Sequence, residues 1–248
     1  MSAPTRDTAQ SSAAREHRRV PRLSSVTAKF VMAATGTVFA LFVVAHLLGN
    51  LKVYLGAEHY DDYGHWLRTL GEPLLPYSGV LWILRVILAL CVLGHIGCGT
   101  MLWLRARKAR GPFKRRNLGW GIRTFSARTM PVTGIVLGLF IVIHILDLTT
   151  GTTPVASSGF DPGTTSTSAA YENLVASLDR PVVASIYLVA MTVLGLHLLH
   201  GLWSVVNDFG VTGQRGRRAA TIVGGTLAAL IFVGNASIPV AVLTGVVS

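Results

Sequence analysis

The sequence predicts an all-α, polytopic membrane protein, and three observations carry that prediction. Hydrophobic residues make up 51% of the 248-residue chain and charged residues only 13%, about half of the charged fraction of a soluble domain. Five apolar stretches each reach the roughly 20 residues that a helix needs to cross a bilayer. Basic residues gather ahead of the first stretch and in the loops after the second and the fourth stretch. A water-soluble fold is therefore excluded.

The five predicted transmembrane helices cover residues 26–54, 78–104, 130–150, 181–206 and 219–247. They are helices because backbone polar groups in lipid must be satisfied within each segment. Residues 1–25 form a basic tail ahead of the five-helix anchor domain of residues 26–248. The first apolar run is too long for the core of a signal peptide, so we expect no cleavage.

Two of the connecting segments differ in character. Residues 60–70 carry Tyr63, Trp66 and Leu67 at helical spacing, which predicts a short helix at the membrane interface. Residues 149–170 are rich in Thr, Ser and Gly and predict an irregular connector. No internal repeat of the kind that marks many transporters is apparent.

The charge distribution predicts the orientation of the chain. Of the 22 Lys and Arg residues, 18 lie in the N-terminal segment up to Lys29 and in the loops after the second and fourth spans, whereas seven of the 11 acids lie in the other loops. Basic loops stay on the cytoplasmic side, so we expect the N-terminus inside and the C-terminus outside. The net charge of +11 therefore reflects topology, and a nucleic-acid partner is not expected because no soluble body carries a basic face.

Histidines inside the spans are the strongest functional candidates, since ionisable groups are costly in a membrane. Counting 1.5 Å per residue from the predicted entry sides places His46 and His144 toward the outer face, and His95 and His197 toward the inner face. Each depth class draws one imidazole from each of two helices. That is the arrangement that up to two bis-histidine haem b groups need, with the first four helices bundled around them. His200, three residues after His197, leaves the choice of ligand in the fourth span open.

The two cysteines of the chain, Cys91 and Cys98, flank His95 on one helical face. Together with His95 and His197 they match the ligand types of a Rieske-type [2Fe–2S] cluster. Along a regular helix, however, the two cysteines are about 10 Å apart, so one iron needs a distorted helix to reach both. Haem b is thus the leading cofactor, and an iron–sulfur cluster at the inner site is the alternative.

A quinone site needs a pocket near a membrane surface with hydrogen-bond donors beside a redox centre. Toward the outer side, Arg85, Trp82 and Asp147 are candidates for a quinone or for haem propionates, and Arg85 and Asp147 are also candidates for an ion pair with each other. Ser204 and Asn207, at the inner end of the fourth span, are candidates for an inner quinone pocket. The sequence leaves the side of the site open.

Four segments carry a family resemblance: HLLGNLKVYLG (46–56), LWILRVILALCVLGHIG (81–97), VTGIVLGLFIVIHILDL (132–148) and YLVAMTVLGLHLLHGLWS (187–204). Over residues 26–212 the chain resembles the succinate dehydrogenase cytochrome b subunit family in its five-helix, single-subunit form, related to the membrane subunit of quinol:fumarate reductase. The resemblance implies a membrane anchor of respiratory complex II in a bacterial plasma membrane, an enzyme subunit without a dehydrogenase site of its own. A flavoprotein subunit would oxidise succinate, an iron–sulfur subunit would dock on the basic face, and this chain would pass electrons to a quinone, menaquinone in this family.

Two other functions remain open at this point. One is a dihaem cytochrome b that anchors a different dehydrogenase or a hydrogenase. The other is a non-redox structural anchor or transporter, in which the histidines serve helix packing or proton relay.

Overall fold

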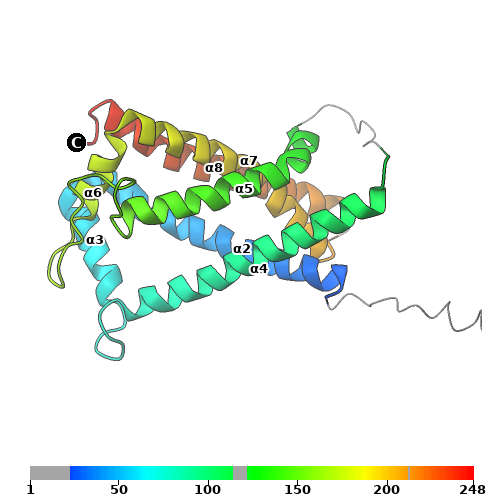
Figure 1. Cartoon of the computed structure of the whole chain (residues 1–248), viewed down its shortest axis with the longest axis horizontal. Coiled ribbons are helices and arrows are strands. Elements are labelled where there is room, and N and C mark those ends of the chain that lie inside the picture. Colours follow the sequence, from blue (N-terminus) through cyan, green and yellow to red (C-terminus); the bar gives the residue numbers. More distant parts are fainter. Residues whose placement is uncertain (1–22, 114–121, 212) are drawn as a thin grey trace, which may run out of the picture.

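The computed structural model describes residues 23–113, 122–211 and 213–248. The predicted cytoplasmic tail of residues 1–25 and part of the basic loop after residue 113 therefore lie largely outside the described residues. The structure is 78% helix, with no strand in the described ranges. The elements are α2 (Ser25–Asn50), η1 (Leu51–Leu55), α3 (Ala57–Thr69), α4 (Gly79–Arg110), α5 (Ile122–Leu148), α6 (Ala170–Leu178), α7 (Pro181–Asp208) and α8 (Gln214–Leu243) (Figure 1).

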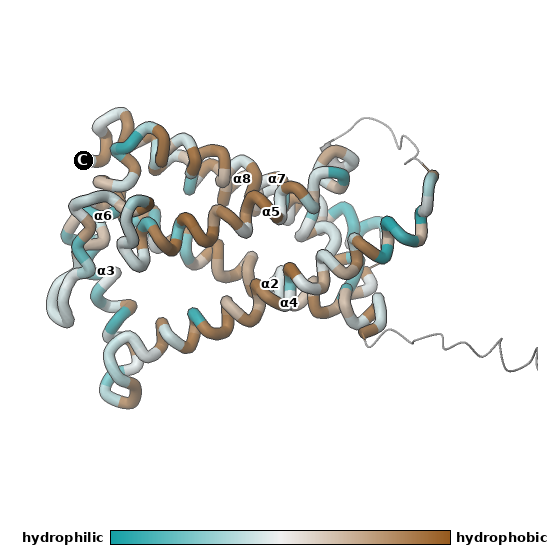
Figure 2. The backbone as a smooth tube through the Cα atoms, viewed as in Figure 1, coloured by the Kyte–Doolittle hydropathy of each residue, from teal (hydrophilic) through white to brown (hydrophobic). Residues whose placement is uncertain are grey.

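Five of these helices are long and apolar enough to span a membrane, which confirms the all-α, multi-pass prediction. The predicted ends were less accurate than the spans. Helix α4 continues to Arg110 instead of ending at residue 104, α5 begins at Ile122 instead of residue 130, and α8 begins at Gln214. The reason is that an apolar run marks the part of a helix that lipid covers, while polar residues continue the same helix beyond it (Figure 2).

The bundle is built from two helix pairs and one covering helix. Helix α2 packs on α4 and α5 packs on α7, while α7 and α2 also contact each other. Helix α8 lies against α7 and α2: an added Cβ at Gly195 of α7 would come 3.3 Å from Phe232 Cβ of α8. The absence of a side chain at Gly195 thus allows the close packing of α8 on α7.

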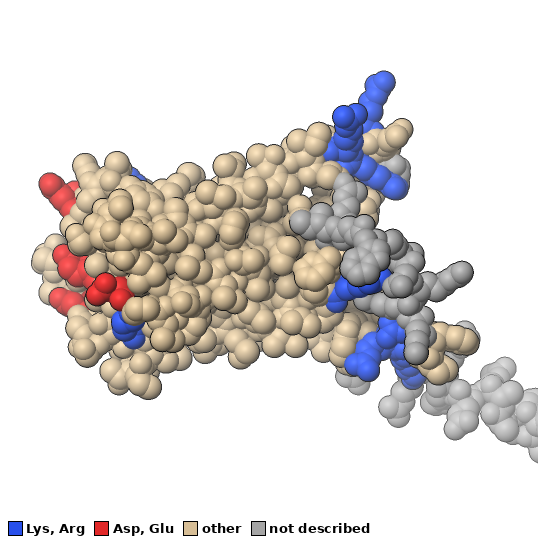
Figure 3. All heavy atoms as spheres, turned by 90° about the horizontal axis from the view of Figure 1, so that it is seen from above, with Lys and Arg blue, Asp and Glu red and all other residues tan. Residues whose placement is uncertain are grey.

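The two ends of the bundle carry opposite charge. Figure 3 shows Lys and Arg gathered at one end and most of the visible Asp and Glu at the other. We call these the basic end and the acidic end. Helix α4 ends at the basic end, where its last turn carries Arg107, Lys108 and Arg110. Helix α3 begins at the acidic end, where its first turn carries Glu58.

A cap of short elements covers the acidic end. Helix α3 forms where the sequence predicts a short helix. The connector of residues 149–170 leads into α6, a helix that the sequence analysis did not predict. Leu174 and Leu178 of α6 are buried against Val53 and Tyr187, so tertiary packing stabilises a helix that is too short to be stable alone.

Candidate functional site

Four histidines meet in two pairs inside the bundle. The ring centroids of His46 in α2 and His144 in α5 lie 5.8 Å apart, and those of His95 in α4 and His197 in α7 lie 6.4 Å apart. These are the pairs that the depth count selects. His200 lies beside the Trp203 ring at 6.2 Å. His197 is therefore the α7 histidine that faces α4.

The pair nearer the basic end is held by two threonines. The Thr35 hydroxyl donates its single hydrogen to the Val31 carbonyl at 2.7 Å, so it accepts from His95 Nδ1 at 3.1 Å. On the opposite helix pair, the Thr133 hydroxyl donates to a backbone carbonyl at 3.0 Å and accepts from His197 Nδ1 at 3.0 Å. This direction corresponds to the tautomer with the proton on Nδ1 in both imidazoles.

The pair nearer the acidic end is held differently. The Tyr187 hydroxyl donates to Asp147 Oδ2 at 2.9 Å, and therefore accepts from His144 Nδ1 at 3.3 Å. His46 stacks on the Phe42 ring at 5.4 Å. In three of the four histidines the Nδ1 proton is thus fixed by a hydroxyl, which leaves the Nε2 lone pair available to a metal.

The donor set fits haem iron better than a bare metal ion. Among the described residues, no three His, Cys, Asp or Glu side chains lie close enough together to hold a metal ion. Haem iron needs only two protein ligands, because the porphyrin supplies the other four. An imidazole nitrogen lies about 2.0–2.1 Å from a bound metal and its ring centroid about 1 Å further, so two imidazoles on one iron have centroids roughly 6–6.5 Å apart. The separation of 6.4 Å between His95 and His197 lies within this range, and the 5.8 Å between His46 and His144 lies just below it.

The geometry gives the alternative iron–sulfur site little support. Helix α4 is continuous from Gly79 to Arg110, without the distortion that a shared iron would need. Cys91 and Cys98 are both free thiols, and Cys98 is buried. On a regular helix their seven-residue separation amounts to about 10 Å along the axis.

A short internal repeat underlies the two sites, and the sequence analysis missed it. Residues 35–46, TGTVFALFVVAH, and residues 133–144, TGIVLGLFIVIH, are identical at seven of 12 positions. The equivalent residues make equivalent contacts. In each copy the threonine accepts from an imidazole of the partner helix, and the following glycine gives that ring room: an added Cβ at Gly36 would lie 3.4 Å from His95 Cε1, and at Gly134 3.9 Å from His197 Cε1.

The repeat also places a phenylalanine four residues before the histidine of each copy. Phe42 lies 5.4 Å from the His46 ring and Phe140 lies 5.7 Å from the His144 ring. Helices α2 and α5 are therefore counterparts, and so are their partners α4 and α7. Comparing the third span with the first, residue by residue, would have revealed this signal.

Asp147 forms a different ion pair from the one considered in the sequence analysis. Its side chain is fully buried and lies 2.8 Å from Arg180 Nη2, whereas Arg85 packs on the Trp82 ring at 4.9 Å. The Arg85–Asp147 pair is therefore wrong. Arg180 lies beyond the long connector, just before α7, where hydropathy gives no hint of a partner for the third span.

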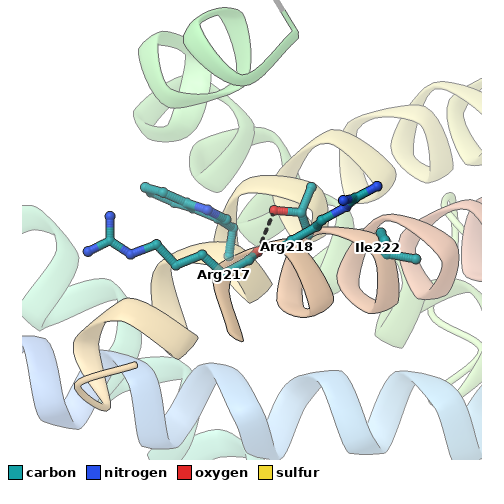
Figure 4. A pocket seen from close by; sticks show the side chains of 5 residues that line it. Arg217, Arg218 and Ile222 are labelled. Atoms are coloured by element: carbon teal, nitrogen blue, oxygen red, sulfur yellow. Dashed lines mark hydrogen bonds between the residues drawn. The ribbon is translucent and has the colours of Figure 1, made fainter. Parts of the chain in front are cut away.

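At the basic end, the residues expected to line an inner quinone pocket are bonded within their own helix. Ser204 donates to Asp208 at 3.5 Å and Asn207 donates to the Trp203 carbonyl at 2.6 Å. An open cavity of about 520 Å³ lies nearby, lined by Trp203, Arg217, Arg218, Thr221 and Ile222. Figure 4 shows that Arg217 and Arg218 point in opposite directions, so they do not converge on one anionic ligand.

The described residues thus form a helical bundle with five helices long and apolar enough to span a membrane and with two pairs of histidines between them. No protein-family model, curated protein or solved structure matches the chain.

Proposed function

We propose that this chain is the membrane anchor and electron-transfer subunit of a succinate:quinone oxidoreductase. The observation that carries the proposal is the two pairs of imidazoles, with ring centroids 5.8 and 6.4 Å apart, in which Nδ1 of three rings lies within hydrogen-bond distance of Thr35, Thr133 or Tyr187. A metal-ligating imidazole donates its other ring N–H to a fixed acceptor, and a hydroxyl stands at that position behind three of these four rings. These sites support an electron carrier with two haems. The family resemblance of residues 26–212 is what points to succinate:quinone oxidoreductase as the particular enzyme.

In this proposal His95 and His197 hold one haem b and His46 and His144 hold the other. When bound, each haem would take up and release one electron at a time. The chain's own residues fix the ligand orientation and keep the sites within the apolar bundle. The spacing of the sites follows from α2: Thr35, beside one site, and His46, in the other, are 11 residues apart, which is roughly 16 Å along a helix.

The charge of the two ends supports the proposed orientation and partners. We propose that the basic end faces the cytoplasm of a bacterial cell, as positive loops do in multi-pass proteins. An iron–sulfur subunit, bound in turn to a flavoprotein subunit, would dock there, because a basic face attracts an acidic partner. Quinone, for which menaquinone is the candidate, would accept the electrons within the membrane.

The haem content of the purified protein tests this function. We expect two protohaems per chain and a reduced-minus-oxidised spectrum typical of a b-type cytochrome. His46→Ala and His95→Ala should each remove one haem, because each removes one axial ligand of a different site. A matched control is His200→Ala, which changes a histidine of the same bundle that lies outside both pairs and should leave two haems in place.

The alternatives predict other results. Cys98→Ala should not change iron or labile sulfide, and loss of labile sulfide in that variant would favour the iron–sulfur cluster instead. A wild-type protein without protohaem or iron–sulfur signal would refute the redox function and favour a structural anchor. Copurification with a covalent-flavin protein that oxidises succinate separates this proposal from a cytochrome b that serves another dehydrogenase or a hydrogenase.

A further inference from the structure

The hydrogen bonds made by Nδ1 of His95, His197 and His144 are not equivalent at the two sites. At the basic-end pair, both Nδ1 protons go to threonine hydroxyls whose own hydrogens end on backbone carbonyls. At the acidic-end pair, the His144 proton goes to Tyr187, and the Tyr187 hydrogen ends on the Asp147 carboxylate. Among the residues that the structure describes, His144 is the one imidazole of the two pairs that is linked through a single hydroxyl to a charged group.

The Asp147 carboxylate is held firmly by three donors. Ser177 donates to Oδ2 at 2.5 Å, Tyr187 donates to the same oxygen at 2.9 Å, and Arg180 donates to Oδ1 at 2.8 Å. The carboxylate is fully buried, so its position is set by these bonds. Charge-assisted hydrogen bonds of this kind are stronger and more directional than neutral ones.

The fold itself does not require this arrangement, as the internal repeat shows. Tyr187 lies ten residues before His197, and the equivalent residue of α4, ten before His95, is Arg85. Asp147 lies three residues after His144, and the equivalent residue of α2 is Gly49. The tyrosine and the carboxylate are thus present in one half of the bundle and replaced in the other.

We propose that Asp147 is a positioning residue that acts through Tyr187 on His144, and that this chain sets the reduction potential of the acidic-end site separately from that of the basic-end site. The inference rests on the proposed haem ligation. A carboxylate behind the hydroxyl makes Tyr187 a better acceptor, which in turn makes the His144 imidazole a stronger electron donor. A stronger donor favours the oxidised state, so the network lowers the potential of the site to which His144 belongs.

Redox titration of the purified complex tests the proposal, with Tyr187→Phe as the main variant. This variant removes the acceptor of the His144 proton but keeps the Asp147–Arg180 ion pair. The spectral component that belongs to the site is identified as the one lost in His144→Ala. We expect its oxidised-to-reduced ratio at a fixed potential to fall roughly tenfold, an upward shift of about 59 mV for one electron. The other component should not move.

Two further variants complete the experiment. Asp147→Asn should shift the same component in the same direction, because it removes the charge behind the tyrosine. Tyr54→Phe is the matched control: it removes a tyrosine hydroxyl near the same end, which is bonded to Ser237 at 2.7 Å and to no imidazole, and it should shift neither component.

The outcomes separate the two proposals. Two haems with unchanged potentials in a folded Tyr187→Phe protein would overturn the inference alone, as would an equal shift of both components. A wild-type protein without haem would overturn the proposed function and this inference with it. If Asp147→Asn fails to fold, Tyr187→Phe still decides the question.

Discussion

Replacing Arg180 with methionine should destabilise the acidic end of the bundle. The Arg180 guanidinium ties three segments together: it donates to Asp147 of α5 at 2.8 Å, to the Val155 carbonyl of the connector at 2.8 Å and to the Ser177 carbonyl of α6 at 3.2 Å. Methionine retains much of the aliphatic stem and removes all of these bonds. The variant leaves the fully buried Asp147 carboxylate without its counter-charge.

The size of the effect follows from the burial of the two partners. Removing one partner of a buried ion pair costs about 3–5 kcal/mol. The Arg180 side chain is 32% exposed, and Ser177 and Tyr187 still donate to the carboxylate. We therefore expect a loss below that range, about 2–3 kcal/mol, because solvent screening reduces the value of the pair. For a chain of this size that corresponds to a fall in melting temperature of roughly 5–10 °C.

Thermal unfolding of the detergent-solubilised protein, followed by circular dichroism, measures the loss. The double variant Arg180→Met with Asp147→Asn should recover part of it, because it removes the uncompensated charge. Arg180→Lys, which keeps the charge but not the planar fork of donors, should fall between the wild type and Arg180→Met. A loss below about 1 kcal/mol in Arg180→Met, or a double variant less stable than the single one, would refute the reasoning.

Three further predictions concern other parts of the bundle. Thr133→Val removes the acceptor of the His197 proton and should lower haem affinity at that site roughly tenfold, whereas Thr133→Ser should not, as measured by protohaem per chain. Gly49→Ala places a Cβ 2.6 Å from the Tyr63 ring and should cost about 1–3 kcal/mol in thermal unfolding. Burial, with a smaller effect of a neighbouring aspartate, raises the pKa of Tyr60 from 10.0 to about 12. Its contribution to stability is therefore present below pH 10 and lost toward pH 12, and Tyr60→Phe should reduce the alkaline loss of unfolding free energy by up to about 2 kcal/mol.

The positions of the spans could be predicted because a bilayer imposes a length and a composition on each of them. The pairing of the histidines could also be predicted, since depth along a helix is a simple product of residue count and rise. His46 and His144 share a depth, and a helix bundle brings residues of equal depth within reach.

The supporting residues could not be predicted in the same way. Thr35 and Thr133 read as ordinary polar residues of a span until their hydroxyls are seen to face the imidazoles. Arg180 and Ser177 reach Asp147 only because the long connector folds back over the end of α5, and periodicity carries no information about such a contact. The repeat of residues 35–46 in 133–144 was visible in the sequence, but its meaning depends on what the threonines contact.

The spacing within this repeat links the two sites mechanically. Eleven residues are close to three full turns of an α-helix, so Thr35 and His46 lie on one face within about 20° of each other, as do Thr133 and His144. Each of these helices therefore sets both the distance between the two sites and their relative rotation about the helix axis. Changes in the length of the loops leave this distance and rotation unchanged, whereas a single residue inserted between threonine and histidine would turn one site about 100° away from the other.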